Sequence, residues 1–339
     1  MKAAVMRHVG APLTLEDVPV PPIAPDEVLI ESRTSGICGT DLHILAGHGY
    51  VPTLPHILGH EPAGVVAEIG RDVTSVRPGD RVVPHLFFSC NHCVYCRSGR
   101  SQQCSNLRGI LGVLGPGAFA EYFKVPAENL FILPDAVPFD AGGLIADAVL
   151  TGLHAMRRAA LKLGDRAVVL GAGGVGQIII QLLAASGVRV AAVDRLTEKL
   201  RLACEMGATA AFDAETETAR AGVLEFSDGA GVECVFNCVG TPDSMKLAAA
   251  LVMRCGRIVV IGEEPGGSPV DTTEIAQREL EIIGSRNGTR QDMAEAVRMV
   301  AAGIVRPYVA ARFPLDRINA AFDCVRGGAL GRVVVVIKE

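Results

Sequence analysis

The sequence contains no tryptophan and is poor in other aromatic residues, with 4 tyrosines and 11 phenylalanines. Proteins that bind sugars by stacking use exposed aromatic rings, so a sugar-stacking platform is not expected. An excess of charge is also lacking, because 32 basic residues stand against 37 acidic ones, for a formal net charge of −5. The sequence therefore gives no electrostatic argument for binding to nucleic acid or to an anionic membrane.

The N-terminal segment carries Lys2 and Arg7 but no apolar stretch of signal-peptide length. One internal segment, 167–188, is uncharged and long enough in principle to cross a bilayer. Its glycines follow an ordered pattern, and β-branched residues stand near its start. A buried strand, turn and helix is therefore expected there instead of a membrane span.

The length of 339 residues favours two domains, since single hydrophobic cores stop growing near ~250–300 residues. Residues 1–147 contain short predicted strands with irregular, proline-rich links, which indicates a mostly β unit. Predicted strands then cover 166–170, 188–193, 209–212, 232–236, 257–261 and 280–283, with helices over 175–186, 197–206 and 243–253. This alternation is typical of a parallel sheet with right-handed crossovers.

A helix over 292–302 and a last strand over 332–337 follow, and this strand is free to return to the first domain. The predicted domains are 1–147 with 290–339, and 148–289.

A glycine-rich loop follows the strand predicted over 166–170. Gly171, Gly173 and Gly176 form the pattern G-x-G-x-x-G, whose glycines permit a tight turn, close approach of a pyrophosphate, and close packing of helix on strand. Asp194 ends the next predicted strand, and a carboxylate there accepts hydrogen bonds from ribose hydroxyls and repels a 2′-phosphate. The loop thus predicts a dinucleotide site that favours NAD, although the neighbouring Arg195 leaves the strictness against NADP open.

Four of the ten cysteines cluster as C-x2-C-x2-C-x7-C, namely Cys90, Cys93, Cys96 and Cys104. Four such thiolates form a closed tetrahedral shell, which predicts a structural zinc ion. An iron–sulfur cluster uses the same ligands, but the sequence shows no paired second cluster. The other six cysteines are scattered and do not suggest a disulfide framework, so a reducing cytoplasm is the expected compartment.

Three separate segments supply further metal-type ligands: Cys38, His60 and Asp147. Each has a plain structural alternative. Cys38 can be a core thiol, His60 a hydrogen-bonded turn residue, and Asp147 the N-cap of a helix over 148–160.

Taken together, these segments resemble the zinc-containing medium-chain dehydrogenases, which include alcohol, polyol and threonine dehydrogenases. The blocks C-G-T-D-x-H (38–43) and G-H-E-x-x-G (59–64), the cysteine cluster and the glycine loop occur in the family's order over nearly the full length. The resemblance implies an α/β protein with two domains. One is a GroES-like, mostly β catalytic domain that carries the structural zinc lobe at about 88–106. The other is a Rossmann domain with a doubly wound parallel sheet.

The resemblance further implies that Cys38, His60 and Asp147 hold a catalytic zinc ion, with Asp147 standing where some relatives have cysteine and others a carboxylate. Glu61 is then expected close to the same metal, where it can exchange with water or substrate. Asp41 is expected to orient the ring of His60.

Thr40 and His43 match the family's proton relay from the substrate oxygen to solvent. Further cofactor contacts are implied for Thr151, Gly174, Val175, Val239 and Arg332. Among these, Val175 and Val239 press on the nicotinamide, and Arg332 contacts the pyrophosphate.

The expected function is reversible hydride transfer between NAD and a small secondary alcohol, diol or polyol, with two zinc ions per chain. A homodimer or homotetramer is expected, through strands near 257–283. Two alternatives are a zinc-free quinone or enone reductase, which leaves both ligand sets unused, and a non-enzymatic nucleotide-binding protein, for which the proton relay has no purpose.

Gly39 departs from relatives that carry a basic residue near the cofactor phosphates at this position. Losing that cation should weaken NADH binding, so we expect Gly39→Arg to lower the dissociation constant of NADH. Isothermal titration of NADH into both proteins measures this, and an unchanged constant would contradict the prediction.

Overall fold

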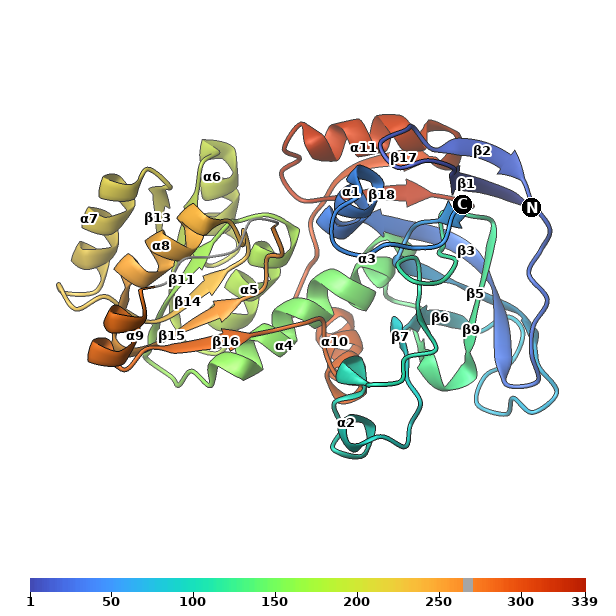
Figure 1. Cartoon of the computed structure of the whole chain (residues 1–339), viewed down its shortest axis with the longest axis horizontal. Helices are drawn as coiled ribbons and strands as arrows, with labels where there is room; N and C mark the ends of the chain where they lie inside the picture. The colour runs from blue at the N-terminus through green and yellow to red at the C-terminus, as the bar shows by residue number, and fades with distance from the viewer. Residues whose placement is uncertain (265–270) are drawn as a thin grey trace. The chain divides into compact units, whose positions relative to one another are not determined.

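The computed structural model describes residues 1–264 and 271–339. The chain divides into two compact units, Met1–Leu150 with Thr289–Glu339, and Thr151–Gly288 (Figure 1). Within the described residues, no helix combines the length and the apolarity that a bilayer crossing requires. The uncharged segment 167–188 instead contains most of strand β11 (Arg166–Leu170) and all of helix α5 (Gly174–Ala185).

The first unit is mostly β. Its main sheet has the strand order β10-β6-β5-β3-β18-β17, with β9 also paired to β3. These strands are β3 (Glu27–Ile37), β5 (Glu61–Ile69), β6 (Arg81–Pro84), β9 (Tyr122–Pro126), β10 (Leu130–Ile132), β17 (Val309–Pro314) and β18 (Arg332–Val336). Smaller sheets contain β1 (Lys2–Met6), β2 (Thr14–Asp17) and β4 (His56–Ile57), and β7 (Phe87–Phe88) with β8 (Gly109–Ile110). The helices are α1 (Gly39–Ala46), α2 (Val94–Arg97), α3 (Phe139–Leu144), α10 (Arg290–Ala301) and α11 (Ile318–Arg326).

Strand β3 organises this sheet. Along one edge it pairs with β5, and along the other it pairs first with β9 and then with β18 (Figure 1). Two register shifts between β3 and β5 bend the pair. Because β3 ends at Ile37 and β5 begins at Glu61, the paired ends of these strands bring Cys38 and His60 to one place.

A helical stretch runs from Phe139 to Ala159, as α3, a π-helical turn (Ile145–Val149) and α4 (Leu150–Ala159). It begins well before the helix expected over 148–160, so the alternative of Asp147 as an N-cap is wrong. Asp147 lies inside the π-helical turn. Such turns insert one extra residue into a helix and are frequent at functional sites.

The second unit is built on one parallel sheet of order β13-β12-β11-β14-β15-β16. Besides β11, its strands are β12 (Arg189–Asp194), β13 (Ala210–Asp213), β14 (Val232–Asn237), β15 (Val252–Val260) and β16 (Glu281–Gly284). The helices besides α4 and α5 are α6 (Thr197–Glu205), α7 (Thr216–Phe226), α8 (Pro242–Leu251) and α9 (Thr272–Arg278). This is the doubly wound order, and it confirms the predicted fold class.

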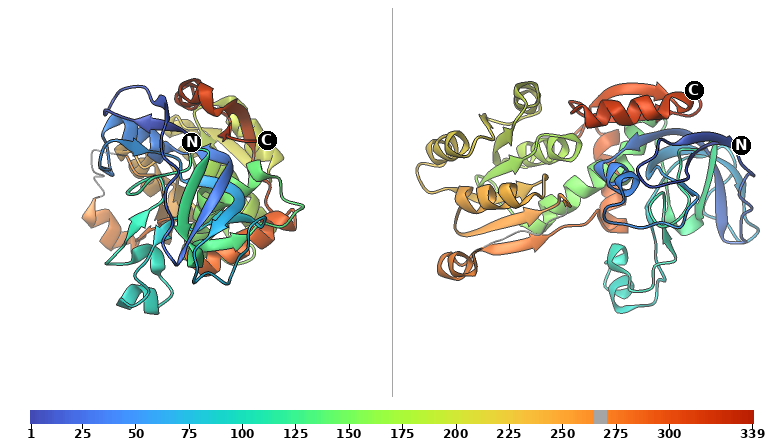
Figure 2. Two further views of the ribbon diagram at one scale, coloured as in Figure 1. Left: turned by 90° about the vertical axis from the view of Figure 1, so that its right-hand side faces the viewer. Right: turned by 45° about the horizontal axis from the view of Figure 1, so that its top comes forward.

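Both faces of the parallel sheet are covered by helices (Figure 2). On one face Ala167 and Val169 of β11 pack with residues of α4, α5 and α6, and on the other Val168 and Leu170 pack with α7 and α8. The alternation follows the two-residue period of a strand. Nearly continuous apolar strands are typical of a sheet that is buried on both faces.

The end of helix α8 shows why a helix can stop before its predicted boundary. The helix expected over 243–253 ends at Leu251, and Met253 lies in β15. Val252 is buried and pairs with Val232 of the neighbouring strand. Pairing within the sheet thus overrides an apolar pattern that is compatible with more helix.

His56 in β4 is buried at 5 % exposure, and its Nε2 atom has no hydrogen-bond partner. Burial lowers the pKa of His56, although a hydrogen bond with the backbone of Gly112 and the charge of Asp41 oppose this. Because the unfolded chain then binds a proton more readily than the folded chain, His56 should destabilise the fold as the pH falls below the ordinary histidine value of about 6.5.

We therefore expect the free energy of unfolding to fall less between pH 7.5 and pH 5.5 in His56→Leu than in wild type, with the pH values chosen to bracket about 6.5. Urea unfolding at both values measures the difference. The exposed His8→Leu serves as the matched control and should behave as wild type. Equal pH dependence in all three proteins would show that His56 does not contribute.

Candidate active site and zinc centres

Cys38, His60 and Asp147 come together in the first unit, and their ligand atoms lie within 4.8 Å of one another. The Cys38 Sγ atom is 3.3 Å from Asp147 Oδ2, and His60 Nε2 is 4.0 Å from the same oxygen. Ligands bound at about 2.0–2.3 Å around one tetrahedral zinc ion are separated by about 3.3–3.8 Å. The sulfur, nitrogen and oxygen donors therefore fit a zinc ion, and three protein ligands leave its fourth position open.

Asp41 fixes two of these ligands. Its carboxylate is fully buried and accepts hydrogen bonds from the backbone N–H of Cys38 at 2.9 Å and of Gly59 at 3.3 Å. It also lies 3.1 Å from Nδ1 of His60, which leaves Nε2 for the ligand group. Burial lowers the pKa of His60, but the charges of Asp41 and Cys38 outweigh burial and raise it well above its usual range. Metal binding must displace that proton, so zinc affinity should fall in acid.

Glu61 lies beside the ligand group and is fully buried. A Cβ atom at Gly36 would overlap its carboxylate, so only glycine fits at this point of β3. Burial and the charge of Asp147 raise the pKa of Glu61 to about 8, while Arg332 and His60 oppose this. The protonation state of Glu61 therefore depends on the charges of Asp147, Arg332 and His60.

The sequence did not predict that Arg332 lies beside the zinc ligands. Its guanidinium lies 2.7 Å from Glu61 Oε1, 3.2 Å from Asp147 Oδ2 and 3.6 Å from Cys38 Sγ, and its side chain is 11 % exposed. The sequence assigned Arg332 only to the pyrophosphate, and that contact stays a prediction. The missed signal is the register of β18 on β3, in which Val333 pairs with Ile37 and so brings Arg332 next to Cys38.

Thr40 and His43 share helix α1, three residues apart, and such spacing puts two side chains on one helix face. The Thr40 hydroxyl is 3.8 Å from Cys38 Sγ. The α1 helix therefore presents a hydroxyl at the ligand group and an imidazole about one turn further along.

The four clustered cysteines also form a ligand group, with their sulfur atoms within 4.8 Å of one another. The contacts are 3.5 Å for Cys93–Cys96, 3.9 Å for Cys93–Cys104 and 4.0 Å for Cys90–Cys96. Sulfur atoms around one zinc ion are separated by about 3.8 Å, whereas a disulfide requires about 2.0 Å. The cluster fits a structural zinc ion and contains no disulfide.

Backbone amides support this lobe. A hydrogen bond from the backbone of Cys96 lowers the pKa of the Cys93 thiol to about 5, while burial raises the pKa of Cys96 to about 12. Outside the cluster, both carboxylate oxygens of Glu128 accept hydrogen bonds from the side-chain nitrogen of Asn91, and Glu128 forms ion pairs with Arg108 and Arg290. A single carboxylate thus ties the lobe to the start of α10.

In the second unit, the glycine loop joins β11 to α5. Gly171 has φ +89°, a conformation that glycine adopts without strain. Gly173 is the N-cap of α5, Gly174 is its first residue, and a Cβ atom at Gly176 would overlap the backbone of Gly171. The backbone N–H groups at the N-terminus of α5 are therefore available to bind an anion, as a pyrophosphate site requires.

Asp194 ends β12 beside this loop. Its Oδ2 atom accepts a hydrogen bond from the backbone N–H of Ala172 at 2.8 Å, and Oδ1 accepts one from Leu196 at 3.0 Å. Each carboxylate oxygen has a second lone pair for a further donor. Arg195 is exposed next to it. Of the other predicted contacts, Thr151 is buried, Val175 is partly buried and Val239 is exposed.

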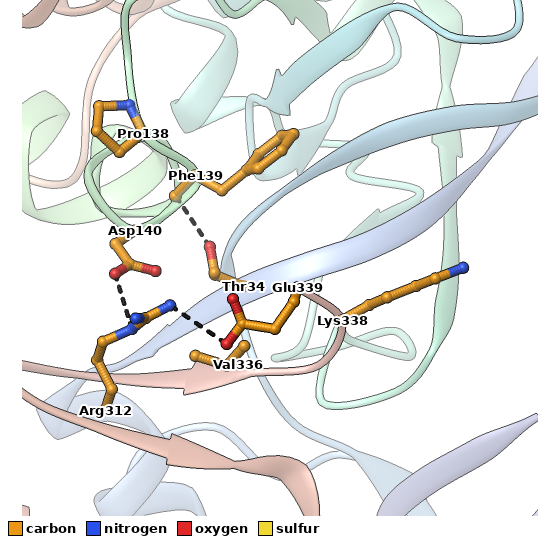
Figure 3. Close-up of a pocket in the computed structure, with 8 residues that line it drawn as sticks. All are labelled: Thr34, Pro138, Phe139, Asp140, Arg312, Val336, Lys338 and Glu339. Atoms are coloured by element: carbon orange, nitrogen blue, oxygen red, sulfur yellow. Dashed lines mark hydrogen bonds and ion pairs between the residues drawn. The ribbon is translucent and has the colours of Figure 1, made fainter.

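A pocket of about 280 Å³ opens elsewhere in the first unit (Figure 3). Three of its charged groups pair with each other: Arg312 lies 3.0 Å from Asp140 and 3.8 Å from Glu339. The fourth, Lys338, pairs with Glu31, which does not line the pocket. None of the predicted site residues lines it.

Comparisons with known proteins identify the family. Residues 24–135 match the family model of the alcohol dehydrogenase GroES-like domain, and residues 174–302 match that of zinc-binding dehydrogenases. The chain is 34% identical to an alcohol dehydrogenase of Geobacillus stearothermophilus, covering 99% of this chain and 100% of the relative. It is 31% identical to an L-threonine 3-dehydrogenase of Bacillus velezensis, covering 99% of each. The crystal structure of the alcohol dehydrogenase from Aeropyrum pernix matches with a TM-score of 0.93 at 30% identity, over 99% of this chain and 100% of that one.

The chain therefore belongs to the zinc-containing medium-chain dehydrogenases, and the predicted family, fold class and cofactors are confirmed. It is an oxidoreductase that acts on a CH–OH group with NAD(P). Cys38, His60 and Asp147 form its catalytic zinc site, and the four clustered cysteines form its structural zinc site. Two ligand groups leave no support for the zinc-free reductase alternative.

The two zinc sites should be separable by mutation. We expect two zinc ions per wild-type chain, one after Cys38→Ser, and one after Cys96→Ser, because each change removes a ligand from one group only. Elemental analysis of the desalted proteins measures the ratio. Cys204→Ser, at an exposed cysteine outside both groups, should retain two. Retention of both ions by Cys38→Ser would contradict the catalytic assignment.

Proposed function

We propose that this chain is an alcohol dehydrogenase that transfers hydride reversibly between NAD and a small secondary alcohol, diol or polyol. The convergence of Cys38, His60 and Asp147 beside Thr40 is the observation that carries this proposal. When bound at that ligand group, zinc supplies Lewis-acid polarisation of the substrate oxygen. The unit of residues 1–147 and 290–339 is the proposed catalytic domain, and 148–289 the proposed cofactor domain.

The proton leaves along α1. In this proposal Thr40 Oγ1 accepts the hydroxyl proton of the alcohol and passes its own proton toward the imidazole of His43, which delivers it to solvent. Asp41 acts by holding His60 and Cys38 in place, as its three hydrogen-bond contacts support. Glu61 and Arg332 balance charge next to the ligands, which their ion pair supports.

The cofactor binds to the second unit. The N-terminus of α5 and the glycine loop receive the pyrophosphate, and Asp194 receives the ribose hydroxyls of the adenosine half. A 2′-phosphate would meet the carboxylate of Asp194, which supports NAD over NADP. Thr151, Val175 and Val239 are proposed as further contacts on this unit, and Arg332 as the pyrophosphate contact from the first.

Homo-oligomers are part of the proposal. Strand β16 is the edge of the parallel sheet, and its Ile282 side chain is 42 % exposed, so the edge is available to pair with a second copy. A purely monomeric species in sedimentation velocity would contradict this. A cytoplasmic location is also proposed, and it is supported by the ten cysteines, all in the described residues, of which none forms a disulfide.

A substrate screen tests the function. Zinc-loaded protein is offered secondary alcohols, diols, polyols and threonine, with NAD and NADP in parallel, and reduced nicotinamide is followed by absorbance. We expect turnover of at least one small alcohol, with kcat/KM for NAD at least about tenfold above NADP because of the charge of Asp194. Thr40→Val should lower kcat by about 10²–10⁴-fold, the usual size of a general acid–base contribution.

Cys204→Ser is the matched control for Cys38→Ser, since both remove one thiol. The control should keep full activity, and Cys38→Ser should lose it together with one zinc ion. Turnover that survives Cys38→Ser would contradict the proposed chemistry, and threonine as the best substrate would replace the proposed substrate class.

A further inference from the structure

Asn237, the last residue of β14, is fully buried and organises the end of the parallel sheet. Its side-chain Oδ1 accepts hydrogen bonds from the backbone N–H of Val239 at 3.1 Å and of Gly240 at 3.0 Å. Its main-chain oxygen accepts two more, from Ile261 at 3.0 Å and Gly262 at 3.1 Å. A single residue therefore holds the chain where it leaves β14 and where it leaves β15.

The amide nitrogen of Asn237 is also engaged. It donates to the hydroxyl of Ser244 at 3.0 Å, and that hydroxyl donates to the backbone oxygen of Thr241 at 2.8 Å. Thr241 is the N-cap of α8. The contacts determine which end of the amide faces the 239–240 turn, so Oδ1 points to the two backbone donors.

This turn lies at the point where a doubly wound sheet binds its ligand. Such sheets bind dinucleotides at the carboxyl ends of the strands where the strand order reverses, and in this sheet β11 and β14 flank that point. The two strand ends are in contact: the backbone N–H of Cys238 donates to Leu170 at 2.9 Å, and a Cβ atom at Gly171 would be 2.9 Å from Val239. Val239 keeps 39 % of its surface exposed beside the glycine loop.

In the proposed function, the two halves of the sheet receive different halves of the cofactor. Asp194 marks the side of β11, β12 and β13 as the adenosine side, because the ribose carboxylate of this fold lies there. The side of β14 and β15 is left for the nicotinamide half. The turn that Asn237 holds is therefore a wall of the nicotinamide half.

We propose that Asn237 is a positioning residue that fixes the Val239–Gly240 turn against the nicotinamide half of the bound cofactor. This inference rests on the proposed function with NAD. Asn237 acts through the turn and touches no reacting atom. Loss of its side-chain hydrogen bonds leaves two backbone N–H groups without their acceptor and lets Val239 move, so binding of the nicotinamide half weakens while binding of the adenosine half is unchanged.

Isothermal titration with two probes, NADH and ADP-ribose, tests the inference on the zinc-loaded full chain, since ADP-ribose lacks the nicotinamide ring. Asn237→Leu keeps a similar volume without hydrogen bonds. We expect its dissociation constant for NADH to rise about tenfold, and that for ADP-ribose to change by less than about twofold. Asp194→Asn is the opposite control, because it should weaken both probes.

Ser244→Ala provides a second variant that leaves Asn237 in place. Removing the acceptor of the Asn237 amide loosens its orientation, so NADH binding should weaken by about threefold and ADP-ribose binding should not. If Asn237→Leu does not fold, the binding of NADH and ADP-ribose by Ser244→Ala tests the inference. Equal losses for both probes, or no loss for NADH, would overturn the inference and assign Asn237 a general role in stability. A wild-type chain that binds neither probe would overturn the proposed cofactor as well.

Discussion

The carboxylate of Asp41 lies at the centre of the catalytic unit, fully buried and in contact with three donors. Those donors come from two strand ends, because Cys38 follows β3 and Gly59 and His60 precede β5. An unsatisfied buried donor costs about 1–3 kcal/mol, so removing the Asp41 carboxylate would leave these donors without their acceptor and destabilise both strand ends. Metal-ligand geometry in this protein thus depends on a carboxylate that does not touch the metal.

A second constraint is that several ionisable side chains are buried together around the zinc ligands. Cys38, Asp147 and Glu61 are acidic groups at one place, and the guanidinium of Arg332 lies against all three. Burying an uncompensated carboxylate is costly, and an opposite charge within a few ångströms offsets that cost. Glycine at position 36 leaves the space that the carboxylate of Glu61 occupies, because a Cβ atom there would overlap Glu61 Oε2.

The parts of the site that the sequence predicted are those with short internal spacing. The four cysteines and the glycine loop each fit within about 15 residues, and the geometry of zinc or of a phosphate turn dictates such spacing. The ion pair of Arg332 with Glu61 joins residues far apart in the chain, and it exists only because β18 pairs with β3 in one register. Likewise, Met253 lies in a strand because Val252 pairs with Val232, a contact that local pattern does not encode. The family resemblance supplied the three catalytic ligands, whose separate positions no spacing rule connects.

The π-helical turn at Ile145–Val149 limits which insertions and deletions the helix tolerates. A π turn contains one residue more than the α turn it replaces, and each residue of an α-helix advances the face by about 100°. A one-residue deletion between Phe139 and Asp147 would remain helical yet rotate the carboxylate away from Cys38 and His60. Surface loops absorb changes in length at little cost, but this helix cannot. A change in the length of this helix therefore disturbs the zinc site as the loss of a ligand does.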